Sequence, residues 1–232
     1  MTTSGPMTTD RAAGPAGAAS KAVIWDGAIR LFHWSTVALV ALAWWSAENG
    51  HMDWHRRFGL TMLGLVTFRL YWGVAGTQTA RFSSFVKGPN AIAAYIRRLK
   101  RPYVAAPGHN PLGALSVLAL IAALVLQVTA GLFAVDVDGL ESGPLSHLVS
   151  FDQGRAAAEF HETVFNILIA LIVLHVAALI FYRVRLHTNL VTAMITGRRA
   201  SSEPGHDGPF PLVRFIIGAA LAGVVVLAVQ QI

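Results

Sequence analysis

The stretch AEFHETVFNILIALIVLHVAALIFYR, residues 158–183, is almost continuously apolar. It is long enough to cross a membrane, for which a helix needs about 20 such residues. Two histidines interrupt it, His161 and His175. Because their spacing is just under four turns at about 3.6 residues per turn, both rings leave nearly the same face of one helix, about 21 Å apart along its axis. Ionisable groups inside a membrane helix are costly and usually functional, so the pattern predicts two stacked sites that each need an imidazole.

The whole chain has the composition of a membrane protein, with 54% apolar and 13% charged residues in 232. It contains no cysteine, which excludes disulfides, iron–sulfur clusters, thiolate zinc sites and covalently attached c-type haem. Nine histidines leave nitrogen-ligated chemistry as the main option. The net charge of +6 does not indicate nucleic-acid binding, because the basic residues fall in loops that flank the apolar segments.

The apolar segments predict an all-α membrane protein, with a four-helix transmembrane bundle and a fifth, C-terminal transmembrane helix. Asp26 is a suitable N-cap for the first helix. The linker after the second helix contains a possible amphipathic helix at residues 90–99. The five membrane helices are expected at residues 28–47, 54–76, 111–133, 158–183 and 211–230.

This pattern divides the chain into three parts. Residues 1–22 are rich in Thr, Ser, Gly, Pro and Ala and are expected to form a disordered cytoplasmic tail. Residues 23–200 form the four-helix domain, and residues 201–232 form a linker and the fifth helix.

Charge bias predicts the orientation of the chain in the membrane. The linker between the third and fourth helices has five acids and one base, Arg155. The linker between the second and third has no acid and six basic residues: Arg81, Lys87, Arg97, Arg98, Lys100 and Arg101. The N-terminus is therefore expected in the cytoplasm and the C-terminus outside it.

In this topology four histidines form two pairs at matched depths. His33 lies about 8 Å from the inner boundary, and His175 lies about 25 Å below the outer one in a core about 30 Å thick. His55 opens the second helix near the outer surface, at the depth of His161. Each pair could bind one haem iron from both sides. Alternatively, each histidine could hydrogen-bond to a neighbouring helix or join a proton relay.

Three further residues are candidates for the sites. Arg69 shares a helix face with His55 and reaches the depth of the inner pair, so it could meet a haem propionate or extend to the inner surface. Arg56, like its neighbour Arg57, could contact the propionates of an outer haem or be solvated. His187 follows the fourth helix and could hydrogen-bond a quinone or be an ordinary interfacial histidine.

Several segments resemble a known family. VIWDGAIRLFHW (residues 23–34) and HRRFGLTMLGLVTFRLYWG (residues 55–73) resemble the first two helices of the bacterial cytochrome b561 family. That family includes the b-type cytochrome subunits of nickel–iron hydrogenases. FHE, LHV and NLVTAMITGRR, within residues 160–199, resemble its fourth helix and tail.

The resemblance implies two haem b groups held by His33, His55, His161 and His175, in a multi-pass protein of the bacterial inner membrane. It also implies electron transfer between the quinone pool and a periplasmic partner, such as a c-type cytochrome or a dehydrogenase or hydrogenase subunit. On this interpretation the chain is an electron-transfer subunit rather than a complete enzyme. Besides quinone and the periplasmic partner, it is expected to contact membrane lipid. The fifth helix departs from the four-helix pattern of the family.

Two alternatives follow from the same residues. The chain could be a stand-alone oxidoreductase that oxidises a small outer species such as superoxide, with quinone as acceptor. It could also be a cofactor-free transporter or proton channel that uses its membrane histidines.

Overall fold

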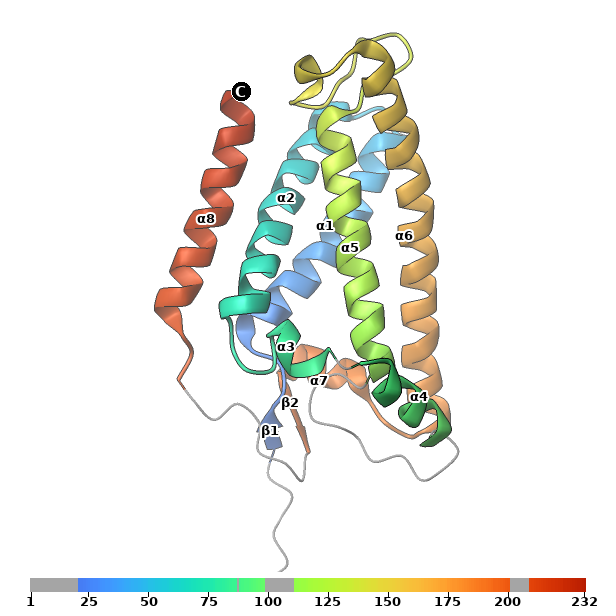
Figure 1. Cartoon of the computed structure of the whole chain (residues 1–232), viewed down its shortest axis with the longest axis vertical. Coiled ribbons are helices and arrows are strands. Elements are labelled where there is room, and N and C mark those ends of the chain that lie inside the picture. The colour runs from blue at the N-terminus through green and yellow to red at the C-terminus, as the bar shows by residue number, and fades with distance from the viewer. Residues whose placement is uncertain (1–20, 87, 99–110, 201–208) are drawn as a thin grey trace, which may run out of the picture.

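Five helices of the computed structural model, which describes residues 21–86, 88–98, 111–200 and 209–232, are long and apolar enough to cross a membrane. They run alongside one another (Figure 1) and confirm the predicted all-α membrane fold. The tail expected at residues 1–22 lies outside the described residues up to position 20. The five helices are α1 (Gly27–Glu48), α2 (Met52–Ala75), α5 (Pro111–Phe133), α6 (Phe151–Arg185) and α8 (Leu212–Gln231).

Short elements cap the two ends of the helices, which are called the lower and upper ends as in Figure 1. The upper end has the 3-10 helix η1 (Ser146–Leu148). The lower end has β1 (Lys21–Val23), α3 (Phe82–Phe85), α4 (Pro89–Arg98), α7 (Leu190–Thr196) and β2 (Arg198–Ala200). The amphipathic helix expected at residues 90–99 is therefore present as α4.

A two-stranded antiparallel sheet joins the segment before α1 to the segment after α7. Lys21 of β1 lies opposite Ala200 of β2, and Val23 lies opposite Arg198. The carbonyl oxygen of Gly197 accepts hydrogen bonds from the backbone N–H groups of the two residues that follow β1, at 2.8 and 3.2 Å. Gly197 has φ +77°, the left-handed conformation with which glycine ends a helix.

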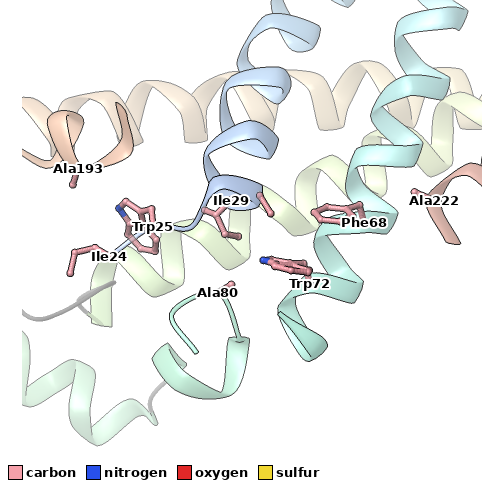
Figure 2. Close-up of a cluster of buried hydrophobic side chains, with 9 residues drawn as sticks. Ile24, Trp25, Ile29, Phe68, Trp72, Ala80, Ala193 and Ala222 are labelled. Atoms are coloured by element: carbon pink, nitrogen blue, oxygen red, sulfur yellow. The ribbon is translucent and has the colours of Figure 1, made fainter. Parts of the chain in front are cut away.

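Helix α2 is the centre of the packing. It contacts α1, α5 and α8, and α5 packs along α6. Buried apolar side chains of α2, α5 and α6, such as Val66, Leu124 and Leu168, form one core cluster. A second cluster at the lower end surrounds Phe68 and Trp72 of α2 (Figure 2). Thus α1, α2, α5 and α6 form the bundle, while α8 stands at one side against α2 (Figure 1).

Asp26 is the N-cap of α1, as predicted, and its side chain also binds residues at the end of α2. One carboxylate oxygen accepts from the backbone N–H of Ile29 at 2.8 Å, as N-cap side chains do. The other accepts from the indole N–H of Trp72 at 3.1 Å and from the hydroxyl of Thr77. This buried carboxylate therefore ties the start of α1 to the end of α2.

Helix α6 begins at Phe151, seven residues before the predicted start at residue 158. The prediction followed the apolar run and missed a capping box. The Ser150 hydroxyl accepts from the backbone N–H of Gln153 at 3.3 Å, and the Gln153 side chain accepts from the backbone N–H of Ser150 at 3.0 Å. Such a reciprocal pair starts a helix ahead of its apolar part.

Candidate functional site

His55 and His161 face each other at the upper end of the bundle. His55 lies in the first turn of α2, and His161 lies about three turns into α6. Their ring centres are 6.0 Å apart, with the ring planes at 78°. The structure therefore brings together the outer two of the four predicted histidines.

Backbone carbonyl groups hold both rings in one tautomer. Nδ1 of His55 lies 2.9 Å from the carbonyl oxygen of Ala43, and Nδ1 of His161 lies 2.8 Å from that of Gln127. Because a carbonyl oxygen only accepts, both Nδ1 atoms carry the proton. The side-chain amide nitrogen of Gln127 lies 3.0 Å from Nε2 of His161 and donates to it. The lone pair of each ring is thus on Nε2, and that of His161 could bind a metal once the Gln127 amide turned away from it.

The ring of His161 fits against α5 only because residue 131 is a glycine. A Cβ atom built on Gly131 would lie 2.9 Å from Cε1 and 3.1 Å from Nδ1 of His161. The first of these distances is closer than non-bonded carbon atoms approach. Gly131 therefore lets the imidazole lie against the backbone of α5, beside the carbonyl of Gln127.

His33 of α1 and His175 of α6 both lie in the lower half of the bundle. The two rings are close enough to interact electrostatically, and both side chains are partly buried. The rings of Trp34 and His33 pack edge to face, with ring centres 4.9 Å apart. Nδ1 of His33 is buried and has no hydrogen-bond partner among the described residues. A buried polar atom without a partner is unusual and points to a group that the protein binds there.

Arg69 does not extend to the lower surface, because only 3% of it is exposed. Its guanidinium lies 4.7 Å from the centre of the Phe82 ring and interacts electrostatically with Asp26. Its Nη1 atom has no hydrogen-bond partner among the described residues. The counter-charge for Arg69 is thus the N-cap carboxylate, which was not among the partners predicted from the sequence, a haem propionate or the inner surface.

Arg56 and His187 both lie at the surface of the helix group. Arg56 forms ion pairs with Asp53 at 2.7 Å and with Glu141 at 3.6 Å. Its partners are thus carboxylates of the protein at the upper end. His187 is exposed in the turn between α6 and α7, with φ +50°, which is uncommon for a residue with a side chain.

Gln127 is the residue of the site that sequence analysis missed. It contacts His161 through both its side chain and its backbone carbonyl. A signal for it existed, because an amide in the middle of an apolar membrane helix needs a hydrogen-bond partner. Its partner could not be named without knowing which face of α5 meets α6.

The His55–His161 pair matches the ligand set of a haem better than that of a bare metal ion. Among the described residues, no three His, Cys, Asp or Glu side chains come together, whereas a zinc site takes about three or four protein ligands. A porphyrin supplies the equatorial nitrogens itself and leaves the axial positions to the protein. Two opposed imidazoles are therefore a sufficient protein contribution.

Comparison with known families agrees with this chemistry. Residues 24–197, more than half of the chain, match the family described as prokaryotic cytochrome b561. The chain belongs to this family. No curated protein and no solved structure matches it.

A prokaryotic cytochrome b561 is a multi-pass membrane cytochrome that binds haem b and takes part in electron transfer. The matched residues contain all four predicted histidines, Gln127 and Asp26, and they end at Gly197, whose carbonyl bonds to Ile24. The first and last residues of the matched region are thus hydrogen-bonded to each other. Helix α8 lies outside it.

Proposed function

We propose that this cytochrome holds two haem b groups and transfers electrons between the quinone pool and a redox partner at its upper face. His55 and His161 would hold one haem, and His33 and His175 the other. Bound haem supplies an iron that accepts and donates one electron at a time.

The geometry of His55 and His161 carries this proposal. An imidazole nitrogen binds a first-row metal at about 2.0–2.1 Å, and the ring centre lies about 1 Å further, so two imidazoles on opposite sides of one metal have centres about 6 Å apart. The observed separation of 6.0 Å agrees. The carbonyl groups of Ala43 and Gln127 keep the Nδ1 protons in place, which orients the rings and raises the basicity of Nε2.

Charge supports a cytoplasmic lower end. Basic side chains including Arg30, Arg81, Arg97, Arg183 and Arg185 lie in or beside the lower-end elements, and such residues favour the cytoplasmic side. Quinone would then be exchanged near the cytoplasmic surface, where His187 is the candidate to hydrogen-bond it.

The upper face supports docking of a basic protein partner. The acidic linker is folded onto the ends of the bundle by backbone hydrogen bonds, including Val135 N–H to Gly154 at 3.1 Å and Leu145 N–H to Leu132 at 2.8 Å. It presents Asp138 as an exposed carboxylate and Glu141 as a half-buried one. Opposite charge steers such a partner to its site and makes the rate depend on salt.

The two alternatives are less well supported. Superoxide is an anion, and the two cations beside the acidic linker are already engaged, Arg56 with Asp53 and Glu141 and Arg155 with the carbonyl oxygen of Val135. A cofactor-free transporter disagrees with a family that binds haem b.

The function is tested with the purified chain in vesicles that contain quinol. We expect the chain to reduce a basic soluble c-type cytochrome added outside, measured by its absorbance, with a rate that falls as salt is raised. Asp138→Asn combined with Glu141→Gln should slow the reaction severalfold at low salt. Superoxide-dependent quinone reduction by the chain alone, with no reduction of the added cytochrome, would contradict the proposal.

A further inference from the structure

A long apolar groove runs beside the contact between helices α8 and α2. It has a volume of about 630 Å³ and lies between α1, α2 and α8. Its lining residues include Phe32 of α1, Leu60 and Gly64 of α2, and Ala219, Gly223 and Leu227 of α8. None of the four predicted haem ligands lines it, so it is distinct from the histidine sites.

The groove has the dimensions of one extended hydrocarbon chain. On α8 its lining residues run from Phe215 to Gln230, which is about 22 Å along the axis at about 1.5 Å per residue. Spread over that length, 630 Å³ gives a cross-section of about 30 Å². The groove therefore extends through most of the apolar layer of a membrane, about 30 Å thick, while remaining narrow.

Small residues keep the groove open on one face of α8. A Cβ atom on Gly223 would meet nothing within 4 Å, whereas a Cβ on Gly218 would lie 2.6 Å from the Tyr71 ring of α2. Helix α8 thus has one face in close contact with α2 and a neighbouring face that stands away from the bundle. In a membrane such a space is filled by lipid.

A cation lies at the upper end of the groove. Arg57 lines it there, with Gln230 on the α8 side, and its guanidinium lies 5.0 Å from the centre of the Trp54 ring. Because Arg57 is two residues from His55, it leaves the opposite side of α2 from the histidine site. Unlike Arg56, it has no carboxylate within ion-pair distance in the described part of the chain.

We propose that this groove binds one anionic phospholipid, with its phosphate at Arg57 and one acyl chain between α8 and the bundle. An arginine beside a tryptophan at the membrane boundary suits a lipid phosphate. Quinone would place a neutral head group there and would leave the charge of Arg57 unmatched. The bound acyl chain would bridge α8 and α1. The direct protein contacts of α8 are mainly with α2.

Native mass spectrometry of the purified full chain tests this site. After removal of lipid, phosphatidylglycerol or phosphatidylcholine with identical acyl chains is added back. We expect one tightly bound phosphatidylglycerol per chain. Arg57→Gln should weaken its binding about tenfold, because a charge-assisted hydrogen bond is lost, without changing the binding of phosphatidylcholine.

Two phenylalanine variants of α8 separate the groove from the rest of the helix surface. Gly223→Phe should fill the groove and abolish the tight binding. Val224→Phe is the matched control, because Val224 is 62% exposed and faces away from the groove lining, so it should bind lipid as the wild type does. The visible spectrum checks that both variants are folded, and it reports on haem independently of lipid.

Equal binding of the two phospholipids, tight binding that survives Gly223→Phe, or recovery of quinone in place of phospholipid from the intact chain would each overturn the proposal. None of these outcomes bears on haem binding. The proposal of a lipid site and the proposal of electron transfer are therefore tested independently.

Discussion

Replacing His161 with alanine is expected to halve the haem content of the purified chain. On the proposed assignment, Nε2 of His161 would hold the upper haem together with His55, and His55 alone would not retain a b-type haem that has no covalent attachment. His55→Ala should have the same effect, and His33→Ala or His175→Ala should remove the other haem. Haem per chain, measured as the pyridine complex, checks the result.

The control for this series is His51→Ala. His51 is exposed at the upper end and its ring packs against Trp45, with ring centres 5.3 Å apart, so its loss should leave the haem content unchanged. Gly131→Ala retains every ligand but displaces the His161 ring, and should shift the spectrum of one haem only. If each ligand variant lost both haems while remaining folded, two separate sites would be ruled out.

Asp26→Ala is expected to destabilise the protein by about 3–5 kcal/mol, the loss seen when one partner of a buried charged network is removed. The change leaves the indole N–H of Trp72, the Thr77 hydroxyl and the Ile29 N–H without their acceptor. It also leaves Arg69 without the nearby negative charge. The effect is measured by thermal or denaturant unfolding in detergent, followed by the circular dichroism of the helices.

Asp53→Ala is the matched control for this prediction. Asp53 is also an aspartate at the start of a helix, but its side chain is 81% exposed, so the change should stay within about 0.5 kcal/mol. Equal stability losses in the two variants would show that the Asp26 network contributes no more than an ordinary helix cap.

The membrane helices could be predicted from the sequence because a bilayer imposes their length and apolar character. Residues 111–133 were predicted with the bounds that α5 has in the structure. The start of α6 was misplaced because its first two turns are polar and depend on the Ser150–Gln153 capping box. Strands β1 and β2 could not be predicted, since each is three residues long and is stabilised only by pairing with a segment far away in the chain.

That His55 and His161 lie at one level could be anticipated because depth follows from topology at about 1.5 Å per residue. The rotation of each helix does not follow in this way. The contacts that the histidines make with their neighbours could therefore not be predicted. They depend on how α5 packs on α6 and α1 on α2, and they involve Gln127, Gly131 and the carbonyl of Ala43. The same limit explains Arg69, whose nearest carboxylate, Asp26, precedes α1 rather than lying within a membrane segment.

The most direct test is the amount of haem in the wild-type chain, purified in mild detergent and measured against total amino acids, together with its electron paramagnetic resonance spectrum. Two opposed histidine pairs predict two haem b groups per chain, both low-spin with two imidazole ligands. A folded chain with one haem, with none, or with a high-spin iron in place of one of the two low-spin signals would contradict the assignment of His33–His175 and His55–His161 as the haem ligands.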